Sequence, residues 1–560
     1  MVFALGGVSA FSQTIQYKNE LTEDWQTLDA SNIEAKCLSK ARALKLSGDF
    51  SSFKVSLKKS NGQYGTYETG LVINACLNDY PDKILANYYD YNNSYLQEVD
   101  MSEVTGLNSL QCFVLGCGLL TKINFPVSTI TNQISLNGAF WRCFSLQKAD
   151  LTMFTNLKDI MQSFVDCYSL TDVKFNKNPE RTELNSLYCA FYGCEKMKTI
   201  DLSMFSIKDE KNSFDRVFYG CLSLNYVYLP TNFVVYGNRH YADSFIEQNF
   251  EESNPNCLKI LTTDEKVPEN MDKWTNIIYN GKAYTDISLF EGSKESSATN
   301  IVYNYTFECP MPFELGDKVA TFTPVVSTYG NGIGGWSTLT IPFTGALQVK
   351  SETDDDYKSV YPATNSFDGY YWLREYKDGK GKAVNFGVVN NVNRVTGEAL
   401  QANIPYIIAF PGSKFGDDSM EGKQIRFIAT SGAIPMTTDL KVNGRSGSYA
   451  FQGNLNGSSA SGTAYKLVSQ EDGRDYFEET TDANLPFHAQ IISTEETVSH
   501  AKRLSIYADG ETTGIVGVAD VTSQQPSTYF TIDGVDTGVT DAKLLKKGIY
   551  IHGNKKIVIG

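Results

Sequence analysis

The sequence has few of the residues on which metal and cofactor sites usually depend. Only four histidines occur among its 560 residues, and none lies near another histidine or near a cysteine in the chain: His240, His488, His500 and His552. The C-x-x-C spacing that is typical of structural zinc sites is absent from the sequence. We therefore predict no cofactor and no metal centre.

Positive charge is also scarce. The formal net charge is -15 at pH 7, and binding to nucleic acid or to anionic lipid head groups needs a basic surface. No run of 18 apolar residues occurs, so the sequence predicts no membrane span. These two absences exclude nucleic acid as an expected partner and leave a chain that does not cross a membrane.

The first 13 residues form a short apolar run that ends in small residues, like the second half of a secretory signal peptide. The basic segment that begins such peptides is missing. We interpret residues 1–13 as a clipped signal peptide, with an ordinary first strand as the alternative. The first reading places the protein outside the cell.

A pattern repeated five times between residues 112 and 230 organises the chain. The units share the pattern F-x-x-C-x-x-L-x-x-I-x-L, with Val114 in the Phe position of the first unit. The step from one cysteine to the next is 26, 24, 27 and 27 residues for Cys117, Cys143, Cys167, Cys194 and Cys221. This period falls within the leucine-rich repeat range and predicts stacked units. The I-x-L end alternates with period two, which predicts a short strand with Ile and Leu facing inward. Stacking would join these faces into one apolar column, with the Phe on its opposite side.

The repeated cysteine invites two functional interpretations, a disulfide or a metal ligand. Each cysteine occupies the same position of its unit, where a small side chain that can be buried is needed, and free cysteine behaves as a small hydrophobe. Cys112 and Cys189, five residues before two of them, receive the same interpretation. We therefore predict core thiols, of which at least one is free or pairs between chains, because the total of 11 is odd.

The fold class predicted for the whole chain is mainly β, a leucine-rich repeat solenoid followed by a β-sandwich-like domain and a small C-terminal β module. Residues 14–290 would form the repeat domain with its caps, closing in a turn and short helix over 267–278, and residues 279–300 would be a connection. Residues 301–512 alternate strand-like runs with Gly, Asn and Asp turns, as sandwich domains do. Residues 513–560 end in a hairpin through Gly553 and Asn554.

The most specific site hypothesis concerns the outward positions of the repeated strands. They form two columns on one face, and repeat proteins commonly bind ligands along such a face. Tyrosines at the end of both columns resemble interface anchors. The alternative is a solvated sheet surface of mixed charge. The predicted ligand-binding residues are Lys122, Asn124, Lys148, Asp150, Asp172, Lys174, Thr199, Asp201, Tyr226 and Tyr228.

The repeat units resemble the BspA-type leucine-rich repeats of bacterial surface proteins. The middle of the chain, with Trp336–Phe343 and Pro405–Phe410, resembles a β domain of secreted Bacteroidetes proteins, and the end, with Asp533-Gly534 and Lys547–Tyr550, resembles their C-terminal sorting-type modules. The resemblance implies a secreted or cell-surface protein that adheres to host proteins or other cells. The family has no shared catalytic residues to carry over.

Three functions remain open at this stage. The first is a non-enzymatic surface adhesin that recognises a host or cell-surface protein along the repeat strands. The second is a surface protein that binds a glycan through aromatic side chains of the middle domain, namely Trp336, Tyr370, Tyr371 and Trp372. The alternative, which we favour for at least half of these rings, is that they belong to the core. The third is an enzyme with an unrecognised site. No motif raises one candidate chemistry, paired carboxylates for glycoside cleavage, above the background. We expect no enzyme.

Overall fold

The structure is a computed structural model of the whole chain. It describes residues 14–27, 41–51, 55–58, 64–67, 95–177, 182–208, 214–230, 249–262, 274–328, 335–364, 368–439, 443–446, 448–457, 462–469, 475–494, 501–508, 511–512, 529–531, 542–546, 548–552 and 555–559. The predicted signal peptide at residues 1–13 lies outside these residues.

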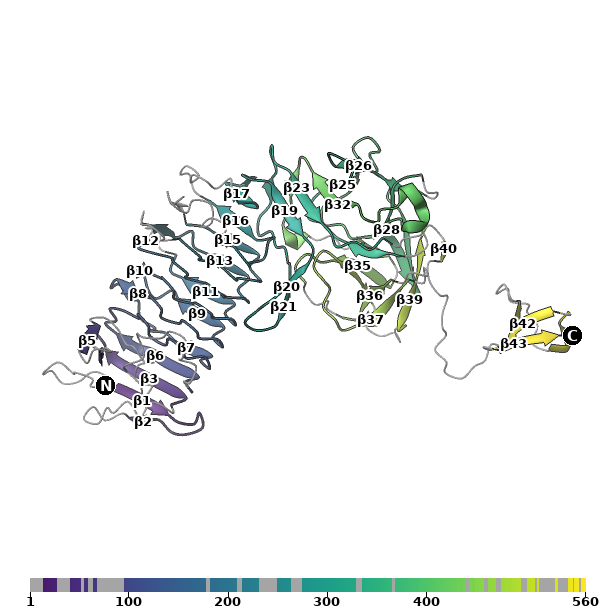
Figure 1. Cartoon of the computed structure of the whole chain (residues 1–560). Helices are drawn as coiled ribbons and strands as arrows, with labels where there is room; N and C mark the ends of the chain where they lie inside the picture. The colour runs from purple at the N-terminus through teal and green to yellow at the C-terminus, as the bar shows by residue number, and fades with distance from the viewer. Residues whose placement is uncertain are drawn as a thin grey trace.

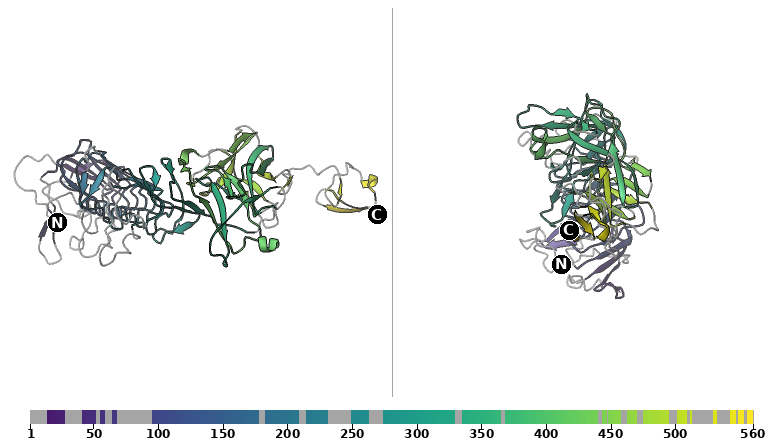
Figure 2. Two further views of the ribbon diagram at one scale, coloured as in Figure 1. Left: turned by 90° about the horizontal axis from the view of Figure 1, so that it is seen from above. Right: turned by 90° about the vertical axis from the view of Figure 1, so that its right-hand side faces the viewer.

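The protein is mainly β, as predicted. The described residues contain no α-helix and only three short 3-10 helices: η5 (Ser413–Asp418), η6 (Thr437–Asp439) and η7 (Ala542–Leu544). In Figures 1 and 2 the repeats follow one another along an elongated body, and a second β region continues from their far end.

The predicted I-x-L strands form, and they pair in parallel within three groups. The first sheet holds, in order, β2 (Gln26–Thr27), β1 (Thr14–Lys18), β3 (Ala43–Asp49), β6 (Glu98–Thr105) and β7 (Lys122–Asn124). A pair follows, of β9 (Lys148–Leu151) and β11 (Asp172–Phe175). The third group is β13 (Thr199–Asp201), β15 (Tyr226–Tyr228), β16 (Leu258–Leu261) and β17 (Ile277–Tyr279).

Further short strands lie away from this face. They form the parallel pairs β8 (Ile134–Ser135) with β10 (Leu157–Asp159) and β12 (Thr182–Leu184) with β14 (Phe205–Ile207). An antiparallel hairpin of β4 (Val55–Lys58) and β5 (Tyr64–Tyr67) precedes the regular units. Main-chain bonds between neighbouring coils continue through the turns, as in the bond from Phe140 N to Ser163 O at 2.8 Å. Neighbouring coils therefore satisfy each other's backbone groups.

The interior of the repeats is a stack of the repeated phenylalanines, as the pattern predicted. Successive rings from Phe140 to Phe250 are near-parallel, with centroids 5.0, 5.6, 5.9 and 5.3 Å apart for the steps through Phe164, Phe191 and Phe218. Trp274 closes the stack with its ring edge-on to Phe250 at 5.1 Å. Because every ring is covered by its neighbours, no single coil could bury this column alone.

Each coil bends twice through backbone conformations with positive φ, which the sequence pattern did not reveal. The first bend falls two residues before the Phe position, at Cys112, Gly138, Gln162, Cys189 and Arg216. The second falls two residues after it, at Gly116, Arg142, Asp166, Gly193 and Gly220. This conformation costs a non-glycine residue about 1–2 kcal/mol, so the closed coil contains local backbone strain at these positions.

The second β region contains two larger sheets. The six-stranded sheet holds β19 (Ile287–Phe290), β23 (Ala320–Thr323), β32 (Gln424–Ala429), β25 (Gly345–Lys350), β26 (Lys358–Val360) and β30 (Glu398–Leu400). The twelve-stranded sheet holds β24 (Ser337–Leu339), β31 (Tyr406–Ala409), β28 (Tyr371–Lys380), β29 (Ala383–Val388), β39 (Arg503–Ala508), β37 (Tyr476–Thr480), β36 (Ala464–Val468), β38 (Ala489–Ser493), β35 (Tyr449–Gly453), β34 (Asn443–Ser446), β27 (Pro362–Ala363) and β40 (Glu511–Thr512).

The central strand β28 is buried on both faces. Tyr371 and Leu373 pack in a core shared with the six-stranded sheet, whereas Trp372 and Tyr376 pack in a second core within the curled twelve-stranded sheet. The β region therefore has two hydrophobic cores, one on each side of β28. A simple β-sandwich of two facing sheets has a single core between them.

The repeats and the β region are joined by a continuous sheet. After β17 it runs through β18 (Lys282–Ala283) and β22 (Phe313–Glu314) to β33 (Ala433–Ile434). One expectation fails here, because Ile277–Tyr279 is a strand and not the end of a helix; residues 267–273 of that predicted turn and helix lie outside the described residues. Residues 279–300, expected as a connection between domains, carry strands. The hairpin of β20 (Ser293–Glu295) and β21 (Val302–Asn304) reaches back alongside the repeats (Figure 1).

The C-terminal residues form a small antiparallel sheet of β41 (Phe530–Thr531), β42 (Gly548–His552) and β43 (Lys555–Ile559). His552 pairs with Lys555, so the predicted hairpin through residues 553–554 is confirmed.

Candidate functional site

The predicted columns are set side by side by the parallel register. Lys148 lies opposite Asp172 and Asp150 opposite Lys174, so neighbouring strands place unlike charges next to each other in both columns. Such cross-strand pairs stabilise a sheet by a few tenths of a kcal/mol to about 1 kcal/mol. The same register relates Thr199 and Asp201 to the two tyrosines of the next strand and Lys122 and Asn124 to the strand before.

Exposure falls along the columns from the N-terminal coils toward the β region. Lys122, Lys148, Asp150 and Lys174 are exposed. The other six predicted residues are half-buried: Asn124, Asp172, Thr199, Asp201, Tyr226 and Tyr228. The open part of the face is therefore formed by β7, β9 and β11.

The aspartates of the second column have a structural role that the sequence analysis missed. Asp150 Oδ1 accepts a hydrogen bond from the backbone N–H of Thr152 at 3.1 Å, and Asp201 Oδ1 accepts one from Ser203 at 3.0 Å. Asp100 does the same for Ser102 in an earlier coil, at 3.0 Å. These side chains hold the turn that follows each strand. The signal was present in the sequence as an Asp two residues before a Ser or Thr.

Asp201 is also held in its charged form. Burial raises the pKa of its carboxyl, but the hydrogen bonds from Ser203 and the Lys177 ammonium, 3.0 Å away, outweigh burial and leave the pKa below its usual value. This carboxylate is occupied within the fold, which makes it a poor candidate for contact with a partner.

The two tyrosines are not free anchors on an open face. Tyr226 and Tyr228 pack against the core of the β region, together with Leu258 and Ile260 of the next strand. The side chain of Asn225 bonds to Thr306 at 2.5 Å and to Glu308 at 3.1 Å, so the segment before β22 is fastened across this end of the repeats. The tyrosines serve the junction between the two regions.

The repeated thiols are core groups, as predicted. Cys143, Cys167, Cys194 and Cys221 are buried, and each thiol donates a hydrogen bond to the main-chain oxygen of the Phe position one coil earlier, at 3.3, 3.0, 3.1 and 3.2 Å. Burial raises the pKa of each of these thiols. A thiol with a raised pKa is a poor nucleophile and a poor ligand, because both roles need the thiolate.

The aromatic side chains proposed to bind sugar are mostly part of the core. Trp336, Tyr371 and Trp372 are buried, with 1%, 0% and 5% of their surface exposed. Tyr370 is exposed and lies edge-on to Tyr361, with ring centroids 5.3 Å apart. Three of the four rings therefore have no face to offer a sugar. The core interpretation is confirmed for these three positions, and the sugar-binding hypothesis fails there.

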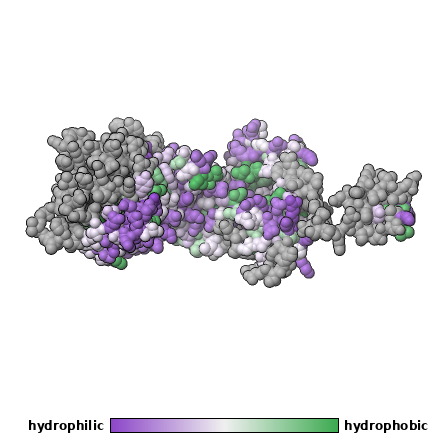
Figure 3. All heavy atoms as spheres, turned by 90° about the horizontal axis from the view of Figure 1, so that it is seen from below, coloured by the Kyte–Doolittle hydropathy of each residue, from purple (hydrophilic) through white to green (hydrophobic). Residues whose placement is uncertain are grey.

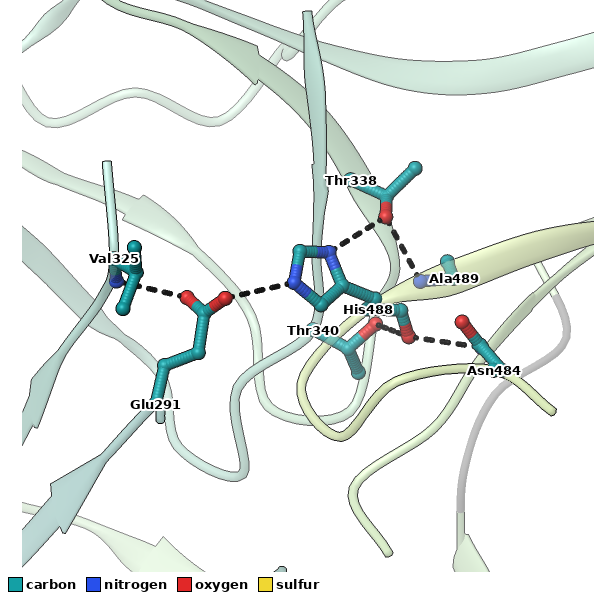
Figure 4. Close-up of polar contacts among 7 residues, drawn as sticks. All are labelled: Glu291, Val325, Thr338, Thr340, Asn484, His488 and Ala489. Carbon is teal, nitrogen blue, oxygen red and sulfur yellow. Dashed lines mark hydrogen bonds and ion pairs between the residues drawn. The ribbon is translucent and has the colours of Figure 1, made fainter. Parts of the chain in front are cut away.

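A polar network around His488 links elements that are distant in sequence (Figure 4). His488 Nε2 lies 2.9 Å from Glu291 Oε1 and its Nδ1 lies 3.0 Å from Thr338 Oγ1. Thr338 Oγ1 accepts a hydrogen bond from the N–H of Ala489 at 3.1 Å, so the Thr338 hydroxyl can donate its own hydrogen to His488 Nδ1. In this arrangement the hydrogen of the imidazole is on Nε2, which donates to Glu291.

The partners of His488 are themselves held within the fold. The Thr338 side chain is buried, and Glu291 Oε2 already accepts the N–H of Val325 at 2.9 Å. The contacts tie the end of β19 to β24 and β38 and so connect the two sheets. His488 was not singled out from the sequence, because its partners lie 150 and 197 positions away.

The character of the surface can be followed on one face of the molecule. On the face seen in Figure 3, hydrophilic residues predominate among those described, and hydrophobic residues form small patches between them. Across the described residues, no helix has the length and apolar character needed to span a bilayer.

Parallel strands stacked at a period of 24–27 residues, with inward aliphatic side chains and a continuous core, define a coiled β-repeat protein of the leucine-rich class. A family comparison agrees: the model described as "BspA type Leucine rich repeat region" matches residues 83–207 and 132–260, with six copies. The chain therefore contains BspA-type leucine-rich repeats, over about a third of its length. No curated protein and no solved structure matches the chain.

Proposed function

We propose that the protein is a non-enzymatic binding protein of the cell surface or the secreted fraction, adhesin-like, that recognises a protein ligand with the repeat strands. The BspA-type repeats support this proposal, because proteins with stacked repeats use extended strand faces for binding. The C-terminal sheet β41–β43 would serve as the sorting-type module that the sequence suggested, and the source would be a member of the Bacteroidetes.

The observation that carries the proposal is the exposed face of β7, β9 and β11. It presents three lysines at successive coils, Lys122, Lys148 and Lys174, next to Asp150. Mixed charge of this kind favours specificity and rate of association more than affinity. The binding face proposed is therefore the N-terminal half of the predicted columns, without Tyr226 and Tyr228.

The test uses the full chain, because the sheet that runs through β17, β18 and β22 joins the repeats to the β region. The full chain and the variant K148E/K174E would be compared on one array of extracellular-matrix proteins and glycans. The matched control is K158E/K382E, which makes the same charge change at two exposed lysines off this face.

We expect at least one protein ligand to be captured by the full chain and the control, and about ten-fold weaker binding by K148E/K174E. Equal binding by all three proteins would exclude the face as the site. Capture of glycans alone would contradict the proposed class of ligand.

A further inference from the structure

A cavity of about 370 Å³ lies between the repeats and the β20–β21 hairpin. Its repeat side is built by the turns that precede the strands, over the coils that contain Cys167, Cys194 and Cys221. Its other side is the hairpin segment from Lys294 to Ala298. Binding pockets are common where two parts of a protein meet, and this volume lies at the lower end of the range for small ligands.

The floor of the cavity is a rigid aromatic surface. Tyr192 and Tyr219 come from equivalent positions of neighbouring coils, and their rings are stacked with centroids 4.8 Å apart and planes at 6°. Tyr168, from another position of the coil, is stacked on Phe144 at 5.2 Å and 4°. Because each ring is held by its neighbour, the cavity keeps aromatic faces and edges in place without a bound ligand.

The hairpin is fixed over this floor by a buried carboxylate. Glu195 is only 4% exposed, and both of its oxygens accept hydrogen bonds: Oε1 from Ser296, and Oε2 from Thr299 at 2.8 Å and Tyr303 at 2.9 Å. The tip of the hairpin is also ordered by its own backbone, since Ser296 Oγ accepts the N–H groups of Ala298 and Thr299 at 3.1 Å. Both walls of the cavity are therefore set in advance.

The lining carries an excess of negative charge. Four carboxylates face one ammonium: Asp166, Glu195, Glu252 and Glu295 against Lys294. Lys294 lies 3.4 Å from Glu252, and Arg142, behind the lining, lies 3.5 Å from Asp166, but Glu295 is exposed at the rim. Burial raises the pKa of Asp166, and the charge of Glu195 raises it further against the effect of Arg142, so a cation that entered would relieve this repulsion.

We propose that this cavity receives an arginine side chain of the protein ligand, an inference that rests on the proposed binding function and extends it. A guanidinium group is planar and weakly hydrated, stacks on aromatic rings, and bonds carboxylates through two N–H groups at once. Tyr192 and Tyr219 supply the rings, and Glu295, at the exposed rim, supplies the carboxylate at the entrance. An ammonium group satisfies the charge but not the stacking, and anions are repelled.

The experiment measures binding of Nα-acetyl-arginine methylamide to the full chain by calorimetry and by NMR. Nα-acetyl-citrulline methylamide, which has nearly the same shape without charge, and Nα-acetyl-lysine methylamide are the comparison ligands. The variant is Glu295→Gln, at the exposed rim, and its control is Glu183→Gln, which removes the same charge at an exposed position of β12 outside the cavity lining.

We expect the arginine derivative to bind at least ten-fold more tightly than the citrulline derivative and about three-fold more tightly than the lysine derivative. Glu295→Gln should weaken arginine binding three- to ten-fold, and Glu183→Gln should leave it unchanged. Equal binding of arginine and citrulline, equal binding of arginine and lysine, or equal effects of the two variants would overturn the proposal.

The array of matrix proteins separates this inference from the proposed function. Capture of a protein equally by the unmodified chain and Glu295→Gln, with no arginine binding, would refute the cavity and leave the function standing. Arginine binding without capture of any protein would show a site for the free amino acid and refute the function. Loss of capture by Glu295→Gln alone would support arginine presented by a protein.

Discussion

Tyr303 donates a hydrogen bond from its hydroxyl to Glu195 Oε2 at 2.9 Å, and the two residues are 108 positions apart in the chain. This contact joins the β20–β21 hairpin to the turn that follows Cys194, in the fourth of the five cysteine-containing coils. The same carboxylate also holds Ser296 and Thr299, so one buried charge fixes the hairpin with three hydroxyl groups.

Replacing Glu195 with Gln should loosen the hairpin. Glutamine has one acceptor oxygen in place of two and no charge, and a hydrogen bond to a charged group is worth about 1.5–3 kcal/mol. We expect a loss of about 2 kcal/mol in the free energy of unfolding, measured with urea, and faster proteolysis at residues 291–305. Glu295→Gln, an exposed change in the same hairpin, should cost less than about 0.5 kcal/mol. Equal stability of the two variants would contradict the role of Glu195.

The buried thiols predict a loss of stability in alkali. Because burial raises the pKa of Cys194 in the folded protein, the unfolded chain releases this proton first, near pH 8.5, while the folded chain retains it. Stability is therefore complete below this pH and falls as pH rises, by about 1.4 kcal/mol per pH unit for each such thiol.

The variant Cys194→Ser isolates this effect, since its hydroxyl does not titrate in that range. With a reducing agent present, the stability difference between the unmodified protein and Cys194→Ser should shrink by about 1.4 kcal/mol per unit between pH 9 and pH 10.5. Unfolding in urea at several pH values measures the difference. A constant difference would mean that the thiol titrates equally in both states.

The bends with positive φ predict opposite effects of glycine and alanine. Gln162 has φ of 54°. Gln162→Gly relieves the strain of this conformation but gives the unfolded chain more conformational entropy, so we expect a net gain in stability of about 0.5 kcal/mol. Gly193 has φ of 72°, and a Cβ there would lie 2.9 Å from Asp166 Oδ1, so Gly193→Ala should lower stability by roughly 2 kcal/mol. The midpoints of thermal unfolding of both variants test these expectations. Destabilisation by Gln162→Gly would show that contacts of the Gln162 side chain contribute more to stability than the backbone strain costs.

The junction predicts that the two tyrosines affect folding more than binding. Tyr226→Ser/Tyr228→Ser removes two half-buried rings from the core of the β region and should lower the free energy of unfolding by about 3 kcal/mol. Lys148→Ser/Lys174→Ser, at exposed positions of the same columns, should change it by less than about 1 kcal/mol. Urea unfolding of both variants, done before any binding assay, makes the comparison. If the tyrosine variant is as stable as the lysine variant, the tyrosines are a free surface after all.

The repeat architecture could be predicted from the sequence because its determinants are local and recur. The spacing from Phe to Cys to Leu to Ile fixes which side chains face inward in every coil, so the strands, the phenylalanine stack and the buried thiols follow from periodicity alone. The aspartates that hold the turns after the strands could also have been recognised in the sequence, because each lies two residues before Ser or Thr. A ligand-binding role was predicted for them instead.

Other features depended on contacts between distant parts of the chain, and no local pattern could show them. Tyr226 and Tyr228 occupy the same repeat positions as exposed residues of earlier coils, yet the segment around Thr306 and Glu308 comes to lie by that end of the face. The sequence also could not show which aromatics of the middle domain are buried. Trp336 and Trp372 pack in a core formed by strands up to β39, whereas Tyr370 is exposed.

The sequence by itself determined the repeated coil, the class of repeat and the acidic character of the protein. Residue spacing and composition are properties of the chain that do not depend on how its distant parts pack. Tertiary structure alone decided which part of the strand face remains open, where Glu195 finds its three hydroxyl partners, and that a cavity with stacked tyrosines and carboxylates lies beneath the hairpin. Burial and electrostatic interaction depend on distances in space, and those are settled only when coils and sheets pack together.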